Sequence, residues 1–478
     1  MAIEFSPELI AIVVLAFYFA AIASAVEAIL YARTAQGSIA WVVSLLTLPY
    51  LTVPLYLVFG RNRFAGYVRE REQVEDMAKL RLSETLSELR DFSATDANLD
   101  FYRSLQSLAR LPTVRGNKAE LLIDGAATFA SIEAGIRAAQ HYVVFQFYII
   151  RDDGLGRRLG AALIDRAQAG VTVYVLFDEI GSSGFARSKL YRELHNAGVN
   201  IAAFNTTQGR RNRFQLNFRN HRKIVSVDGR SAWIGGHNVG DEYLGEDPRR
   251  GPWRDTHVKL DGPVVMGAEL TFATDWLWAK REPLKINWQP EAKAQGQCSV
   301  LLFPSDPASE FEEAGLMYHQ VITQAKTRIW IVSHYFVPDR GIIAALQLAA
   351  LRGVDVRVMI PDKPDGPVVG MANWSFTREL LPAGVAVYRY EPAFVHQKVF
   401  LMDSEMAGVG TANFDNRSFR LNFEITALVH DTAFCEDVEA MLEEDFRHAR
   451  QVTAEELADK PFWFPLAMGA ARLVSPVL

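Results

Sequence analysis

The stretch Asn220–Tyr243, NHRKIVSVDGRSAWIGGHNVGDEY, contains the pattern that decides the fold. His221 and Lys223 are two residues apart at the start of an apolar, β-branched run, and this spacing puts both side chains on one face of a strand. Asp228-Gly229 predicts a tight turn, and the letters SAWIGG after it predict the returning strand. We therefore expect a β-hairpin that presents an imidazole and an ammonium group at one end.

The same pattern, His-x-Lys-x-x-x-x-Asp, occurs again in the second half of the chain. Its members are His221, Lys223 and Asp228 in the first copy and His396, Lys398 and Asp403 in the second. Each copy is followed by a glycine-containing turn that ends in an amide side chain, Asn238 or Asn413. One His-x-Lys pair would be a weak signal, because such pairs are common in solvated strands. Two copies with the same spacing and the same following turn are specific.

The repeat extends over whole domains. FQFYIIRDDG at 145–154 resembles VSHYFVPDRG at 332–341, and AQAGVTVYVLFD resembles ALRGVDVRVMIPD. Each half predicts a strand and then a helix, Tyr142–Ile150 with Leu155–Gln168 in the first half and Arg328–Val337 with Gly341–Leu351 in the second. The pattern indicates an internal duplication of an α/β domain, with a sheet between helices.

Two apolar runs precede the repeat, at 9–30 and 39–60, and each is long enough to span a bilayer as a helix. Pro49 and Pro54 would kink the second run, which leaves a re-entrant hairpin as an alternative to a full crossing. Several arginines follow the second run: Arg61, Arg63, Arg69 and Arg71. The positive-inside rule then places the N-terminus and everything after residue 60 in the cytoplasm.

The expected division of the chain has four parts. Residues 1–62 form a transmembrane hairpin, and 63–117 form a helical linker whose charged, Leu-spaced sequence predicts amphipathic helix. Residues 118–290 and 291–478 form the two similar domains, with a boundary in the polar stretch near 285–297. The length of 478 residues agrees with several units.

Charge and cysteine content exclude some functions. A net charge of −6 and a pI near 6.0 argue against a general nucleic-acid binder, which is usually basic. Two cysteines provide no disulfide framework and no zinc pattern.

The repeated residue types suit phosphodiester exchange. Histidine serves as nucleophile or as acid and base near neutral pH, lysine is a point-charge partner for phosphate, and Asn238 and Asn413 can donate to phosphoryl oxygens. Two such half-sites around one phosphorus form a complete set without a metal or cofactor. A metal site at His221 and His396 is the competing interpretation, but a lysine two residues away would repel a divalent cation.

Each histidine needs a carboxylate on its second ring nitrogen to fix its tautomer. Asp228 and Asp403 sit at the hairpin turns, where we expect them to hold the fold. Asp255 and Glu424, downstream of the two amides, are better candidates for orienting the histidines, although an ordinary salt bridge is an equal alternative for Asp255.

Three further features have alternative interpretations. Arg210, Arg211, Arg213 and Arg219 precede the first motif, either as a solvated loop or as a basic lip that gathers anionic lipid headgroups. His237 and His334 flank the motifs and are expected to be structural.

The twin motifs resemble those of the phospholipase D superfamily. The strings NHRKIVSVDG, IGGHNVGDEY and GTANFDNRSFRLNFE are similar to bacterial cardiolipin synthases within it, over nearly the whole chain. The resemblance implies two halves related by a pseudo-twofold axis. It also implies phosphatidyl transfer between two phosphatidylglycerol molecules, giving cardiolipin and glycerol through a phosphohistidine, with His221 as nucleophile and His396 as acid and base.

By the same resemblance, the partners are phospholipid and membrane rather than nucleic acid, and the location is a bacterial inner membrane. The rival functions are a phospholipase D that transfers to water, a nuclease of the same superfamily, and a membrane scaffold with a degenerate site. The acidic charge and the apolar runs count against the nuclease, and the two complete motifs count against the scaffold. The sequence leaves open the acceptor and the oligomeric state, a homo-oligomer included.

Overall fold

The computed structural model describes residues 6–32, 34–60, 67, 87, 89–94, 99–205, 207, 217–286 and 294–475. The chain divides into two compact units, Met1–Arg69 with Thr206–Phe218, and Glu70–Asn205 with Arg219–Leu478. Several features predicted from the sequence lie outside the described residues. They are most of the amphipathic segment before residue 99, part of the boundary near 285–297, the four arginines after residue 60, and Arg210, Arg211 and Arg213.

The first unit contains α1 (Pro7–Tyr31), α2 (Ala35–Thr47), α3 (Pro49–Leu55) and a π-helical turn (Tyr56–Gly60). Among the described residues, α1 is the one helix that is long and apolar enough to cross a membrane. The second apolar run breaks at Leu48, directly before Pro49, one of the two prolines at which the sequence predicted a kink. A residue before proline disfavours helical dihedrals, and Pro49 then starts the next helix at its first position.

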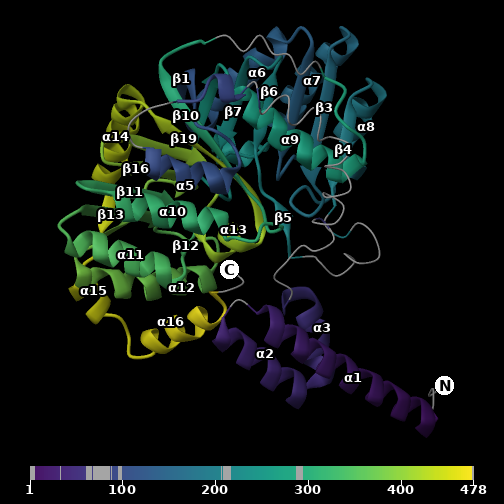
Figure 1. Ribbon diagram of the computed structural model, residues 1–478, viewed down its shortest axis with the longest axis vertical. Helices are drawn as coiled ribbons and strands as arrows, with labels where there is room; N and C mark the ends of the chain where they lie inside the picture. Colours follow the sequence, from purple (N-terminus) through teal and green to yellow (C-terminus); the bar gives the residue numbers. More distant parts are fainter. Residues whose placement is uncertain are drawn as a thin grey trace. The chain divides into compact units, whose positions relative to one another are not determined.

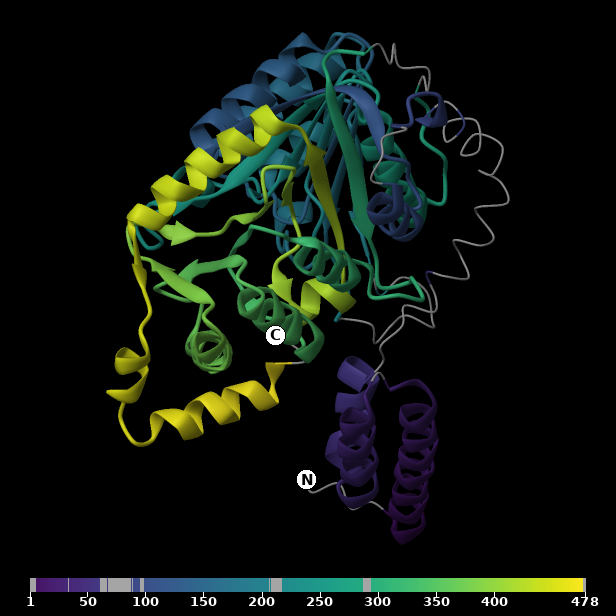
Figure 2. The same cartoon turned by 60° about the vertical axis from the view of Figure 1, so that its left-hand side comes forward.

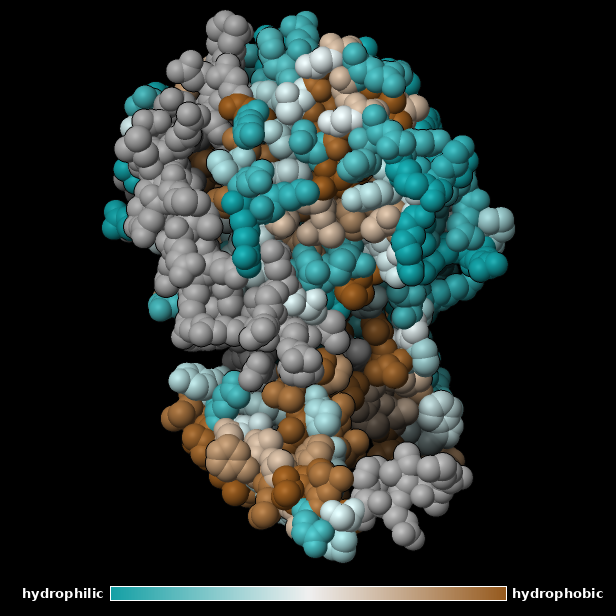
Figure 3. Space-filling view, turned by 90° about the vertical axis from the view of Figure 1, so that its right-hand side faces the viewer, coloured by the Kyte–Doolittle hydropathy of each residue, from teal (hydrophilic) through white to brown (hydrophobic). Residues whose placement is uncertain are grey.

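Small residues on α1 bring the helices of this unit together. Ala21, Ala25 and Ala28 are buried in a cluster with Leu45 and Tyr56. Large apolar side chains point outward instead, among them Leu15, Phe19, Ile22, Leu30, Ile39 and Leu51. Figure 3 shows the resulting apolar surface on these helices, coloured brown.

The second unit is built on one long mixed sheet. From the edge to the middle, its first part contains β4 (Asn200–Phe204), β3 (Thr172–Asp178), β2 (Tyr142–Phe147), β6 (Ile224–Val227), β7 (Ser231–Gly235), β9 (Thr256–Asp261) and β1 (Val114–Ile123). Its second part contains β20 (Ala449–Gln451), β14 (Ala386–Tyr390), β13 (Asp355–Pro361), β11 (Arg328–Ser333), β16 (Lys398–Met402), β17 (Met406–Gly410), β19 (Asn422–His430) and β10 (Cys298–Ser305).

The strand order repeats on the two sides of the antiparallel contact between β1 and β10. Apart from β20 at one edge, each strand of the first part has a counterpart in the second with the same neighbours, as β6 and β16 show by pairing with β2 and β11. The first strand, β1, begins at Val114, inside the expected linker. Short strands complete the chain: β5 (Arg219–Asn220), β8 (Trp253–Arg254), β12 (Phe336–Val337), β15 (Phe394–Val395) and β18 (Phe414–Asp415).

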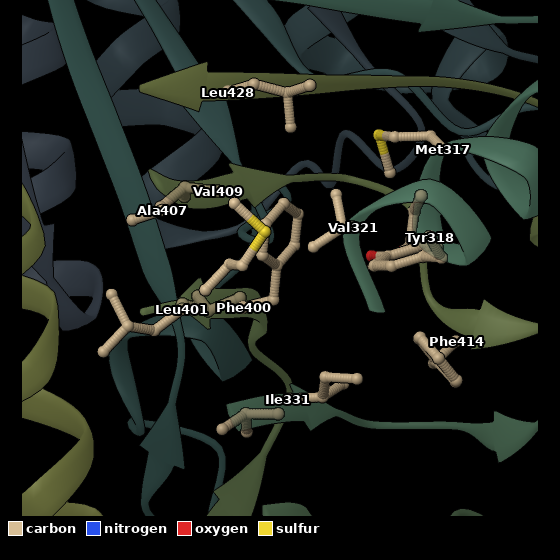
Figure 4. Close-up of a cluster of buried hydrophobic side chains, with 14 of the residues drawn as sticks. Met317, Tyr318, Val321, Ile331, Phe400, Leu401, Ala407, Val409, Phe414 and Leu428 are labelled. Atoms are coloured by element: carbon tan, nitrogen blue, oxygen red, sulfur yellow. The ribbon is translucent and has the colours of Figure 1, made fainter. Parts of the chain in front are cut away.

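Helices cover both faces of the sheet (Figures 1 and 2). The helices of this unit are α5 (Leu99–Ala109), α6 (Asp124–Ala138), α7 (Gly154–Gln168), α8 (Lys189–Asn196), α9 (Val265–Lys280), α10 (Glu313–Gln324), α11 (Arg340–Leu351), α12 (Pro367–Leu380), α13 (Asn416–Arg420), α14 (Thr432–Arg447), α15 (Ala454–Ala458) and α16 (Phe464–Leu473). Of these, α16 packs on α12 and not on the sheet. Figure 4 shows part of the core, where Tyr318 of α10 faces Phe400 of β16 with ring centroids 5.8 Å apart.

The predicted alternation of strands and helices is confirmed, with one correction to the repeat. The parallel bridge between Ile150 and Val239 corresponds to the pairing of Phe336 with Phe414. The equivalent of Tyr148 is therefore His334, and not Tyr335 as the sequence match suggested. The sequence alignment paired Tyr148 with Tyr335 because the two residues are identical. The strand register shifts this pairing by one residue, to His334.

Candidate active site

The two motif aspartates lie at the turns of their hairpins. Asp228 and Gly229 both have positive φ, 53° and 65°, as a tight hairpin turn of this kind requires, and Asp403 has φ 53°. The Asp228 carboxylate accepts hydrogen bonds of 2.8 Å from the backbone N–H groups of Gln140, His141 and Tyr142. Asp403 does the same for the backbone before β11. Both carboxylates thus tie a hairpin to the chain that enters the neighbouring strand.

Each motif histidine lies just before its hairpin, on a short segment that pairs with the other part of the unit. The sequence predicted His221 and Lys223 within a strand, whereas β6 begins at Ile224. His221 lies outside β6 because it continues the short strand β5, which pairs in parallel with β19. The His221 N–H therefore donates to the Phe423 carbonyl at 2.9 Å. The equivalent pairing of β15 with β8 lets the His396 N–H donate to the Arg254 carbonyl at 2.8 Å.

The orienting carboxylates are exchanged between the two parts. Nδ1 of His221 lies 2.9 Å from Oε2 of Glu424, and Nδ1 of His396 lies 2.7 Å from Oδ2 of Asp255. Glu424 also accepts from Thr411 Oγ1 at 2.6 Å, and Asp255 accepts from its neighbour's backbone at 2.8 Å. A carboxylate on Nδ1 holds the proton there, which leaves Nε2 of each histidine with a lone pair.

Burial favours the neutral form of both imidazoles. It lowers the pKa of His221 to about 4, although Glu424 acts in the opposite direction. Burial also lowers the pKa of His396 well below its ordinary value, and the charges of Lys398 and Lys223 and the imidazole of His221 add to this effect. The two motifs therefore share one electrostatic environment. The pKa of Glu424 is below its ordinary value, because His221 and Lys223 outweigh the opposing effect of burial.

The two lysines are buried and hold the backbone of their own motifs. Lys223 Nζ donates to the His221 carbonyl at 2.7 Å, and Lys398 Nζ donates to the His396 carbonyl. Burial lowers the pKa of Lys223 to about 7 and that of Lys398 to about 8. An entering anion would favour the charged form of both groups, because opposite charges raise the pKa of an ammonium.

The two amides are buried near the motifs, in different states. Asn238 accepts from the Ile149 N–H at 3.1 Å and donates to the Tyr243 hydroxyl at 2.9 Å. Asn413 Oδ1 is buried without a hydrogen-bond partner within the part of the chain that the structure describes. Of the two flanking histidines, His237 has its Nδ1 3.0 Å from Nδ1 of His257.

Sequence reasoning missed Tyr148 as a ring over His221, and it expected His334, which lies over His396, to be structural. The Tyr148 ring lies with its centroid 5.0 Å from that of His221, and the His334 ring lies 5.2 Å from that of His396. His334 Nδ1 is 3.2 Å from the Val395 carbonyl. Both rings follow the first strand of the repeat, and the one-residue error in the sequence match concealed their equivalence.

Sequence reasoning also missed the residue between each histidine and lysine. Arg222 donates to Asp275 at 2.6 Å and to the Glu424 carbonyl at 3.0 Å, so it supports the backbone of the orienting glutamate. Gln397 donates to Asp445 at 3.1 Å. The sequence held two signals for these contacts. They are the charged Arg222 at the start of an apolar run and Asp275 within the apolar helix α9.

Comparison with known proteins identifies the family of the chain. The family model for the phospholipase D-like domain of cardiolipin synthase matches residues 132–247 and 318–446. Cardiolipin synthase A of Pseudomonas fluorescens (strain SBW25) is 46% identical over 99% of both chains, and that of Pseudomonas entomophila (strain L48) is 46% identical over 96% of both. The crystal structure of phosphatidylserine synthase from Haemophilus influenzae Rd KW20 shares the fold, with a TM-score of 0.61 at 15% identity over 79% of this chain and 100% of that one. The chain belongs to the cardiolipin synthase family of phospholipase D-like enzymes.

Proposed function

We propose that this enzyme transfers a phosphatidyl group between two phosphatidylglycerol molecules, giving cardiolipin and glycerol. The observation that carries the proposal is the reciprocal pairing of His221 with Glu424 and of His396 with Asp255. It provides two imidazoles, each with a free Nε2, in the electrostatic field of two lysines. One phosphodiester exchanges for another of similar energy, so the reaction needs no nucleotide.

The proposed reaction has two steps. We propose that the second histidine takes up a proton on Nε2 when the anionic lipid binds. Nε2 of the first histidine then attacks the phosphorus, the bond to the headgroup glycerol oxygen breaks, and the protonated histidine gives its Nε2 proton to that oxygen. The second histidine then takes the proton from a headgroup hydroxyl of the next phosphatidylglycerol, which attacks the phosphohistidine. Lys223 and Lys398 neutralise the phosphoryl oxygens, and Asn238 and Asn413 are proposed to donate to them.

Glu424 and Asp255 are proposed to stabilise the imidazolium that forms on each histidine. Asp228 and Asp403 complete the motifs in sequence, and we assign them the support of the two hairpins, because their carboxylates bind backbone amides. The two domains, near 118–290 and 291–478, are proposed to be related by a pseudo-twofold axis. The repeated strand order supports this relationship.

We also propose that α1 crosses a bacterial inner membrane and that α2 and α3 return toward the same side, or enter it as a re-entrant pair. The exposed apolar residues of these helices support insertion. The catalytic domains are proposed to face the cytoplasm, following the arginines after residue 60.

A product assay tests the proposal. Purified enzyme in liposomes receives labelled phosphatidylglycerol alone, without nucleotide or added metal. Cardiolipin and free glycerol are expected. Phosphatidic acid and glycerol without cardiolipin would contradict the proposal and identify water as the acceptor.

A further inference from the structure

The two ends of the active site carry different side chains at equivalent positions. Arg219 opens β5 and Phe394 opens β15, the two equivalent short strands. Arg417 and Glu242 each lie four residues after the amide of their motif. Two arginines therefore occupy, beside His221, the positions that hold an aromatic ring and a carboxylate beside His396.

Backbone contacts place these two arginines together. The Arg219 N–H donates to the Leu421 carbonyl at 3.4 Å, and the Leu421 N–H donates to the Arg417 carbonyl at 2.8 Å. Both arginines are half-buried. Leu421 thus links β5 to the end of α13 and sets the two guanidinium groups on neighbouring segments.

Electrostatic interactions connect this pair to the ring over His221. Burial lowers the pKa of Arg417, and the charge of Arg219 lowers it further, while Tyr148, Asp415 and Asp178 act in the opposite direction. The charges of Arg219 and Arg417 both act on Tyr148, whose ring centroid lies 5.0 Å from that of His221, so the pair lies on the His221 side of the site. A bound anion would add to the favourable effect of Asp415 and Asp178 on this pair.

The equivalent positions at the opposite end carry an aromatic ring and a carboxylate, Phe394 and Glu242. Phe394 packs on Trp253 at 4.8 Å and on His334 at 4.6 Å. Glu242 is paired with Arg151 at 3.0 Å and lies 3.8 Å from Arg250. The end beside His396 is thus largely aromatic, and its two arginines contact two carboxylates, because Arg250 also lies 3.2 Å from Asp365.

Cardiolipin synthesis brings two phosphates to the site, one that reacts and one that belongs to the acceptor lipid. We propose that Arg219 and Arg417 form a second anion subsite, which binds the phosphate of the acceptor phosphatidylglycerol while its headgroup hydroxyl attacks. Arginine suits this role, because its planar donors match phosphate oxygens. The inference rests on the proposed function and deepens it, since acceptors such as water and glycerol carry no phosphate to be held there.

Comparing two acceptors, glycerol and phosphatidylglycerol, distinguishes a loss of acceptor binding at the subsite from a loss of the chemical step. Labelled glycerol takes the phosphatidyl group from the same phosphohistidine and regenerates labelled phosphatidylglycerol, whereas phosphatidylglycerol as acceptor gives cardiolipin. In liposomes that contain phosphatidylglycerol and labelled glycerol, Arg417→Gln and Arg219→Gln are expected to lower cardiolipin formation roughly 10-fold or more. Glycerol exchange is expected to stay near the wild-type rate, and Arg417→Lys to recover part of the loss.

Arg420→Gln is the matched control, because Arg420 lies on the same helix and pairs with Glu312 at 2.9 Å and Asp339 at 3.3 Å instead. It should leave the ratio of the two products unchanged. Equal loss of both products in folded Arg417→Gln and Arg219→Gln, or no loss in either, would overturn the subsite. A wild-type enzyme that forms neither product would overturn the proposed function itself, so the two failures are distinct.

Discussion

Glu424 binds the ring of His221 across 203 positions of sequence, with Oε2 2.9 Å from Nδ1. Asp255 binds His396 in the same way across 141 positions. Each carboxylate serves the histidine of the other part of the sheet, and the backbone N–H of each histidine is held by a residue adjacent to the same carboxylate. Neither part contains a complete histidine–carboxylate pair by itself.

Glu424→Gln is expected to lower kcat for cardiolipin formation by about 100-fold or more, because an amide no longer stabilises an imidazolium on His221. Asp255→Asn should have a similar effect through His396. Glu133→Gln, which alters a surface pair with Arg137, is the control and should retain full activity. Near wild-type kcat in both site variants would contradict the orienting role.

His221→Ala and His396→Ala are each expected to abolish turnover, since each removes one of the two groups that exchange protons or form the adduct. The covalent intermediate trapped from the wild type should be acid-labile and base-stable, as a phosphohistidine is. Chelators should leave the rate unchanged. An acid-stable adduct would point to another nucleophile, and a large chelator effect restored by a divalent ion would support the metal interpretation.

Asp228→Asn should act on stability rather than on chemistry. Asparagine tolerates the positive φ at this turn, so the substitution removes mainly the charge that binds three backbone N–H groups. We expect a loss of about 1–3 kcal/mol in the free energy of unfolding, measured by denaturant titration in detergent. Activity per folded molecule should be retained. A fully folded variant with a collapsed kcat would show that Asp228 takes part in the reaction.

Acid should destabilise this enzyme through its buried histidines. Burial lowers the pKa of His221 to about 4 and those of His237 and His257 to about 3, whereas the unfolded chain titrates at 6.5. Between about pH 6.5 and 4 the unfolded state therefore binds more protons than the folded state. As the pH is lowered through this range, the free energy of unfolding decreases by roughly 1.4 kcal/mol per pH unit for each such group.

Denaturant titrations at several pH values measure this dependence. His237→Asn removes one buried titrating group and should reduce the slope of stability against pH by about one histidine. A slope equal to that of the wild type would show that His237 titrates normally in the folded state.

Local sequence patterns predicted the turns and hairpins, because these depend on residues that are close together in sequence. Asp228-Gly229 predicted the turn, the letters around it predicted β6 and β7, and the second motif predicted the equivalent hairpin of β16 and β17. Asp255 and Glu424 were selected because a histidine needs a carboxylate at Nδ1. The break at Leu48 also followed from a local rule, since Pro49 was recognised as a point where the second apolar run would bend.

Local sequence patterns could not predict which residues far apart in the sequence pair with one another. Nothing near Glu424 in sequence indicates that its partner is His221 rather than His396, because the choice depends on the parallel pairing of β5 with β19. The equivalence of Tyr148 and His334 depends on strand register, which the letters alone misplaced by one residue. Arg222 was passed over because its role lies in contacts with Asp275, on a helix that follows much later.

The pairing of β5 with β19 also determines when the pair of His221 and Glu424 can form during synthesis. The first motif leaves the ribosome with its histidine unsupported, and it stays so until residue 424 has been made and β19 has closed against β5. Closing so large a loop is slow and comes after local structure has formed. The pair of His221 with Glu424 can therefore form only on a nearly finished chain.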